Sequence, residues 1–163
     1  MKEIIAHPAE LIIAKDDEVI TSYALGSGMG ICIYDTMKHI AGFIQAFCKA
    51  RQQNDNDLKY IDTAFKQLYE LMLKEGCQHE HLVVKLVGGA TLFQFPDEVV
   101  ADIGRANTKS AYHMLEELKL PLAGEDVGDR YGRTLHFQVE DGLVHIMTKN
   151  KYLIYYLRKE NVK

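Results

Sequence analysis

The stretch ALGSGMGICIYD, residues 24–35, joins a glycine-rich turn to an apolar run. The run MGICIYD, residues 29–35, is β-rich and mostly apolar, which is typical of a strand buried on both faces. Glycines in the preceding turn, Gly26-Ser27-Gly28, allow the backbone to approach a neighbouring group closely. Enzymes often present a nucleophile where a loop enters a regular element. Position 28 has no side chain, so it offers nothing that can attack.

Strand and helix patterns alternate along the remaining chain. A helix is expected from an N-cap at Asp57 to about Lys74, with Gly76 as its stop, and a second helix around residues 107–118. Residues 81–90 predict a buried strand that runs into the Gly88-Gly89 turn. Further strands are expected at 9–15, 18–25 and 39–47, which suggest a hairpin or meander with 29–35, and at 120–128, 132–140 and 142–149, the last two joined by an Asp141-Gly142 hairpin turn.

This order of elements predicts an α+β fold, with helices covering one or both faces of the sheets. The 163 residues are enough for one domain with a sizeable core, and 47% hydrophobic with 26% charged residues is an ordinary globular balance. We therefore expect residues 1–163 to form a single domain.

Charge and cysteine content exclude several classes of function. The net charge is −4 and no run of lysine or arginine occurs, which argues against nucleic-acid binding. No apolar segment has the length of a membrane span, and the N-terminus is too charged for a signal peptide. Three cysteines without zinc-site spacing predict reduced thiols in the cytoplasm, with no metal and no cofactor.

Five blocks of the chain resemble one family, in that family's order. The five blocks read LGSGMGICIYD (25–35), IAGFIQAF (40–47), VKLVGGATLF (84–93), IGRAN (103–107) and GEDVGDRYGRTLHF (124–137). In the same order, the family motifs that they resemble are LGSC followed by an apolar strand, GGMAHxML, K-x-x-GGA-x-xF, IGxRN and GEDVGGxxGRxxxF. The family is CheD, the chemoreceptor glutamine deamidases of bacterial and archaeal chemotaxis. The resemblance covers about residues 10–149 and leaves 150–163 as a C-terminal extension.

The resemblance implies a layered sandwich of mixed or antiparallel β-sheet with flanking helices, and a thiol chemistry. In the family a cysteine thiolate attacks a receptor glutamine amide, a histidine activates the thiol, and an upstream hydroxyl orients the histidine. The family cysteine falls on Gly28 and the family histidine on Gln45. The hydroxyl falls on Ser22, or on Thr21 if the strand slips by one residue. Glycine cannot form a thioester and glutamine cannot act as a base, so the chain resembles a catalytically inactive member.

One function follows from this loss of chemistry. The chain is expected to act as a binding or regulatory module for chemoreceptor helices or for a CheC-type phosphatase, with a groove near Gly28 and Gln45. Ser27, Gly88 and Gly89 are expected to belong to the same binding site. Their glycine turn is better explained as a tight corner of the fold than as a phosphate loop, because no P-loop lysine follows it.

The alternative is an active glutamine deamidase with a displaced nucleophile. Cys48 is the best candidate, with Ser27 second, and a spatial pairing of Cys48 with His39 stays open. Cys32 lies inside the apolar strand and is expected to be a buried, inert thiol. The adjacent carboxylates of residues 125 and 126 are expected to point to opposite faces of a strand, which argues against a shared proton.

The C-terminal extension leaves two possibilities. Residues 151–158, YLIYYL flanked by charges, are aromatic and apolar on one side. They either dock on their own domain or form a homodimer or partner contact, since tyrosine-rich edges are favoured at interfaces.

Overall fold

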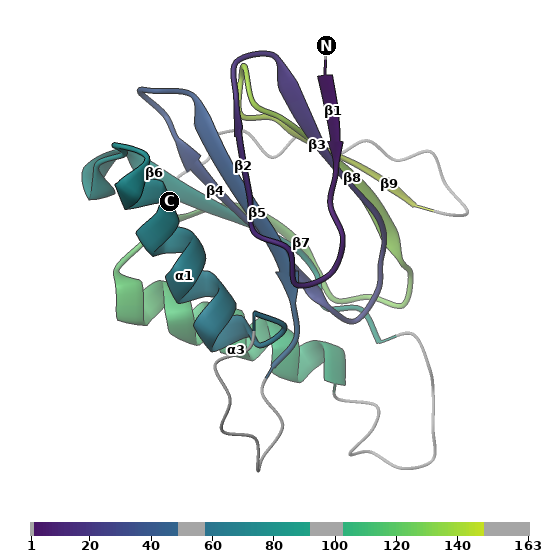
Figure 1. The fold of residues 1–163 in the computed structure, drawn as a ribbon. Coiled ribbons are helices and arrows are strands. Elements are labelled where there is room, and N and C mark those ends of the chain that lie inside the picture. The colour runs from purple at the N-terminus through teal and green to yellow at the C-terminus, as the bar shows by residue number, and fades with distance from the viewer. Residues whose placement is uncertain (1, 49–57, 92–102, 149–163) are drawn as a thin grey trace, which may run out of the picture.

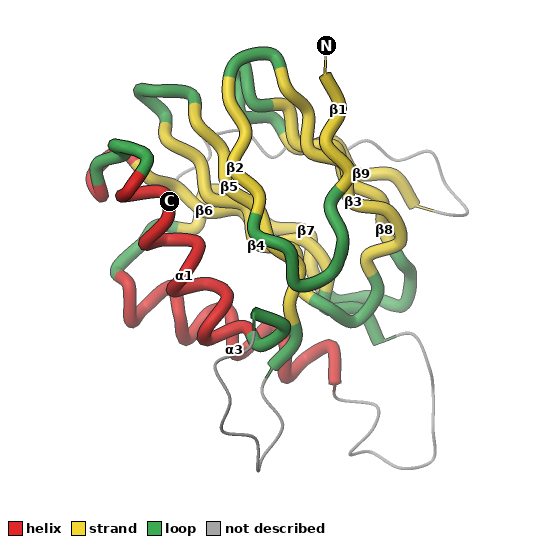
Figure 2. The backbone as a smooth tube through the Cα atoms, in the orientation of Figure 1, coloured by secondary structure: helices red, strands yellow, loops and turns green. Residues whose placement is uncertain are grey.

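Strand β4 (Met29–Asp35) lies at the centre of the larger of two sheets, and each of its residues is buried. The computed structural model describes residues 2–48, 58–91 and 103–148. In these ranges two sheets pack face to face, and the long helices cover the outer face of the larger sheet (Figure 1). Figure 2 shows the helices gathered on one side of the strands. The predicted α+β layered fold is confirmed.

Both sheets are mixed. The five-stranded sheet is antiparallel except for its β6–β7 pair, and its order is β2 (Ile12–Lys15), β5 (Ile40–Ala46), β4, β6 (Leu82–Gly88) and β7 (Leu122–Val127). The four-stranded sheet is antiparallel except for its β1–β3 pair, and its order is β1 (Lys2–Ile5), β3 (Glu18–Leu25), β8 (Arg133–Gln138) and β9 (Val144–Thr148).

The layers enclose two cores, and β4 contributes to both. Alternate residues of β4 face opposite sides of the sheet. Met29, Ile31 and Ile33 pack toward the helices α1 (Ile61–Lys74) and α3 (Ile103–Leu118), whereas Cys32 and Tyr34 pack toward the second sheet. This double burial confirms the prediction made from the apolar run.

Both predicted helices form, with different starting points. Helix α1 begins at Ile61 after Tyr60, and the N-cap predicted at Asp57 lies outside the described residues. Gly76 follows its end with φ +95°, as expected of a stop. A single-turn 3-10 helix, η1 (His79–His81), then leads into β6. Helix α3 starts at Ile103 rather than near residue 107. Its first turn packs on the backbone of the turn at Gly89 and Ala90 and has no apolar pattern of its own, so the sequence pattern does not predict it.

The predicted meander in the first third of the chain is wrong in part. Only β4 and β5 pair as neighbours in sequence, whereas β2 pairs with β5 in one sheet and β3 pairs with β1 and β8 in the other. The charged turn between β2 and β3 therefore carries the chain from one layer to the next. Strand β1 was not predicted, because its four residues are mostly exposed and carry no apolar pattern. The β8–β9 hairpin forms as predicted, with Gly142 at φ +77°.

Membrane insertion by a helix finds no support in these ranges. No helix of the described residues is long and apolar enough to cross a bilayer. The extension 150–163 and its proposed contact segment 151–158 lie outside the described residues.

Helix α1 packs directly on β5, which yields a stability prediction. A Cβ on Gly42 would lie 2.9 Å from Leu68 Cδ1, and Leu68 is fully buried. We expect Leu68→Ala to lower the free energy of unfolding by about 2–5 kcal/mol, because it leaves a cavity under the helix. Leu73→Ala, on the same helix but 38% exposed, should change it by less than about 1 kcal/mol. Urea denaturation measures both, and equal losses would contradict this packing.

Candidate active site

The structure places Gly28 beside Gln45. Gly28 directly precedes β4, and Gln45 lies near the end of the paired strand β5, opposite Gly30. A Cβ built on Gly28 would lie 3.2 Å from Gln45 Nε2. Gln45 is 8% exposed, and Gly28 is also buried. The two positions that the family resemblance singles out are thus within side-chain contact distance of each other.

The two candidate hydroxyls on β3 face opposite ways. Thr21 Oγ1 donates to Glu3 Oε2 at 2.7 Å and lies 3.0 Å from His136 Nδ1. Ser22 points to the opposite face of the sheet, the same face as the core residue Ile20. Ser22 Oγ is buried and finds no hydrogen-bond partner within the described ranges. Of the pair, Ser22 is therefore the hydroxyl that faces the interior between the sheets.

The turn before β4 is held by hydrogen bonds to three of its own backbone carbonyls. The amide of Gly89 donates to Gly28 O at 3.0 Å, and the amide of Ala90 donates to Gly26 O at 3.1 Å. Ser27 O accepts a hydrogen bond from Asn107 Nδ2 at 2.6 Å. The turn is therefore fixed at three successive residues by groups from the turn that follows β6 and from α3.

Asn107 links the two halves of the site. Its Nδ2 bonds the turn at Ser27, and its Oδ1 accepts from the Cys48 amide at 2.6 Å, just beyond β5. Asn107 is fully buried, where an unsatisfied amide would be costly. Sequence reasoning quoted this residue within the IGRAN block but assigned it no role. The sequence signal for its role was its position: Asn107 lies on the face of the predicted helix that the apolar residues place toward the core.

The Gly88-Gly89 turn lies against this loop, as expected of a tight corner. Gly88 has φ +125°, and a Cβ there would lie 2.2 Å from Gly28 O. Gly89 has φ +67°, and a Cβ there would lie 2.3 Å from Thr108 Oγ1 on α3. Both positions therefore exclude a side chain on two grounds, conformation and space. Whether they also contact a ligand stays a prediction.

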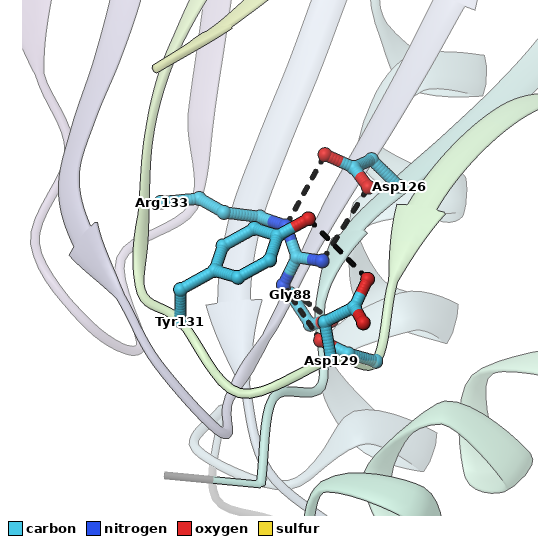
Figure 3. Close-up of polar contacts among 6 residues, drawn as sticks. Gly88, Asp126, Asp129, Tyr131 and Arg133 are labelled. Atoms are coloured by element: carbon cyan, nitrogen blue, oxygen red, sulfur yellow. Dashed lines mark hydrogen bonds and ion pairs between the residues drawn. The ribbon is translucent and has the colours of Figure 1, made fainter. Parts of the chain in front are cut away.

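Arg133 fastens the far side of the same turn (Figure 3). Its guanidinium pairs with Asp126 through Nε–Oδ2 at 3.2 Å, and its Nη1 donates to the carbonyls of Gly128 at 3.1 Å and Gly88 at 3.4 Å. The ring of Tyr131 stacks on it at 4.7 Å from the ring centroid. Arg133 is 1% exposed, so its charge is stabilised by this paired and hydrogen-bonded environment.

The neighbouring carboxylates point apart, as predicted. Asp126 turns toward Arg133, whereas Glu125 accepts a hydrogen bond from Tyr112 on α3. Burial and the Glu125 carboxylate raise the pKa of Tyr112 to about 12. The two carboxylates therefore fasten different layers of the fold and share no proton.

The alternative nucleophile lies in an unfavourable environment. Partial burial raises the pKa of the Cys48 thiol, so the reactive thiolate is scarce near neutral pH. The pairing of Cys48 with His39 is wrong, because the two lie beyond opposite ends of β5, a strand that spans roughly 20 Å. His39 Nδ1 is instead 2.7 Å from Tyr34 Oη. Cys32 is buried as predicted, and burial raises its pKa to about 12.

The described residues contain no cluster of three or more histidine, cysteine, aspartate or glutamate side chains placed to hold a metal ion.

The close approach of Gly88 to the loop yields a second prediction. Gly88→Ala should lower the free energy of unfolding by roughly 2–5 kcal/mol, from backbone strain plus the clash with Gly28 O. Gly128→Ala is the matched control, since Gly128 also has a positive φ, +86°, but no atom lies within 4 Å of its built Cβ. That control should cost about 1–2 kcal/mol from conformation alone. Equal losses in denaturation experiments would show that the contact with Gly28 is unimportant.

The raised pKa of Cys48 yields a third prediction. Because burial disfavours the thiolate, the alkylation rate of Cys48 should rise with pH around a midpoint above that of a free cysteine peptide. Mass-spectrometric peptide mapping after iodoacetamide treatment at several pH values measures this for each cysteine separately. A midpoint below that of the free peptide would instead identify an activated thiol.

Comparison with known proteins identifies the family of the chain. The model of a family described as CheD chemotactic sensory transduction matches residues 46–148. The chain is 38% identical over 144 residues to a probable chemoreceptor glutamine deamidase CheD of Clostridium novyi (strain NT), which covers 86% of this chain and 89% of that protein. A protein of the same name from Clostridium botulinum (strain Hall) is 38% identical over 152 residues, covering 91% and 94%. One from Caldanaerobacter subterraneus is 35% identical over 144 residues, covering 86% and 89%. The chain therefore belongs to the CheD family, that of the chemoreceptor glutamine deamidases.

Proposed function

We propose that this chain is a catalytically silent CheD protein that binds chemoreceptor helices without deamidating them. The observation that carries the proposal is that the side chain of Gln45 lies next to the place where a side chain at position 28 would begin. A thiol attack needs a nucleophile and a base at hydrogen-bonding distance. Here those two places hold a residue without a side chain and an amide that does not titrate near neutrality. Loss of both groups removes the chemical step, since such residues act as a unit.

Binding requires less of the same site than catalysis does. The turn at residues 26–28 is held by Gly89, Ala90 and Asn107, none of which depends on a cysteine at position 28. The Gln45 side chain offers one hydrogen-bond acceptor and two donors. A primary amide of a receptor glutamine is complementary to that set, and the relatives are named as deamidases of chemoreceptor glutamines. A CheC-type phosphatase is the second partner that the family resemblance implies.

The alternative, an active deamidase that uses Cys48, has weaker support. Its thiol has a raised pKa. Its backbone amide donates a hydrogen bond to Asn107 Oδ1 beyond the end of β5. These observations favour a binding role over a displaced nucleophile.

A single experiment separates the two functions. The full chain is incubated with a glutamine-bearing chemoreceptor helix, with binding followed by calorimetry and deamidation by mass spectrometry as a gain of about one dalton per converted amide. We expect binding and no mass change. The Gln45→Ala variant should bind more weakly, because it removes the amide donors and acceptor.

Cys48→Ser is the matched control for the alternative. It should leave binding unchanged in our proposal. Deamidation by the wild-type chain that disappears in Cys48→Ser would establish the displaced nucleophile instead. Absence of binding both to the receptor helix and to a CheC-type phosphatase would overturn the binding role.

A further inference from the structure

The ring of Phe47 covers the α-carbon of Gly28. A Cβ built on Gly28 would lie 2.9 Å from Phe47 Cζ, closer than real Cβ atoms approach, and 3.0 Å from Phe47 Cε1, so the end of the Phe47 side chain would have to shift. Gln45 Nε2 is the next neighbour at 3.2 Å. The space that a side chain at position 28 would enter is therefore already filled, mainly by an aromatic ring.

The backbone of Phe47 is fixed on both sides. Its amide donates to Lys59 O at 2.8 Å, and its carbonyl accepts from the Ile61 amide at 2.7 Å. These bonds tie the end of β5 to the start of α1. Because the main chain is held, room at position 28 arises only if the ring turns about its own side-chain bonds. The Phe47 side chain is 37% exposed, so part of it faces solvent.

The backbone of Gly28 itself does not demand glycine. Its φ lies outside the positive range in which Gly88 and Gly89 are found. At those two glycines a Cβ would also meet fixed backbone or α3, whereas the three atoms nearest to a Cβ at Gly28 belong to the side chains of Phe47 and Gln45. Position 28 is thus restricted by two replaceable side chains.

We propose that Phe47 is a third determinant of the silent site, matched to Gly28 and blocking a side chain at position 28. The inference rests on the proposed function only in taking position 28 as the family's nucleophile position. Its consequence is that Gly28→Cys with Gln45→His does not by itself restore a usable thiol. The ring must also be shortened, so that the introduced thiol can face both the position-45 side chain and an incoming amide.

A double-mutant cycle on stability tests the steric match. Gly28→Ala should lower the folded-to-unfolded ratio in the Phe47 background, and Phe47→Ala should remove most of that loss, a coupling of about tenfold that lies within the range for contacting residues. Gly30→Ala is the matched control, since the nearest neighbours of its built Cβ are Phe43 and Leu25. Its cost should be the same with either residue at position 47.

An equal cost of Gly28→Ala in both backgrounds would overturn the proposal, because the ring would then move aside freely. If Phe47→Ala fails to fold, Phe47→Leu replaces it in the same cycle, since leucine shortens the side chain and keeps it apolar.

Thiol reactivity tests the chemical consequence. Iodoacetamide labelling of Gly28→Cys/Gln45→His, with peptide mapping to separate the introduced thiol from the three native ones, is compared with the triple variant that adds Phe47→Leu. We expect labelling at position 28 to be about tenfold faster in the triple variant, in line with the same coupling. Equal rates would overturn the proposal.

Deamidation of the receptor helix by the triple variant but not by the double variant would support the proposal further. The proposed function and the role of Phe47 can fail independently. If the wild-type chain fails to bind the helix, the proposed function fails while the stability cycle and the labelling comparison still decide the role of Phe47.

Discussion

The approach of Gly88 to the carbonyl of Gly28 is the constraint on which the rest of the site depends. It brings the end of β6 under the turn that leads into β4, at a separation that leaves no room for a Cβ. The same approach allows the amides of Gly89 and Ala90 to bond the turn, and it places Gly104 at the start of α3 against the carbonyls of Gly89 and Ala90. Sheet, turn and helix therefore meet at one point, and none can shift without the others.

Buried polar groups stabilise that meeting point from both sides. Asn107 bonds the turn and the segment after β5, and Arg133 bonds the carbonyls of Gly88 and Gly128 while paired with Asp126. Each of these groups is satisfied only when every segment is in place, because a buried amide or guanidinium without partners is costly. The network thus favours one geometry of the turn over alternatives that hydrophobic packing alone would allow.

The residues that maintain this geometry differ from those that would perform thiol chemistry. Gly88, Asn107 and Arg133 are required by space, conformation or buried polarity. At Gly28 the backbone conformation does not demand glycine, and the nearest atoms to a built Cβ belong to the replaceable side chains of Phe47 and Gln45. A chain of this fold can therefore lack the reacting groups and retain the shape of the site. This separation is what the proposed binding role without catalysis requires.

The sequence by itself determined the family, the α+β class and the doubly buried strand 29–35, because these follow from local motifs and from the period of apolar residues. It also singled out Gly28 and Gln45, through motif positions alone. Tertiary structure decided which strands share a sheet, so β2 and β3 separate although only a short turn joins them. It decided that Ser22 rather than Thr21 faces the interior, and that Asn107 and Phe47 reach the turn before β4. Those contacts join segments far apart along the chain, and no local pattern records which distant group a buried side chain will meet.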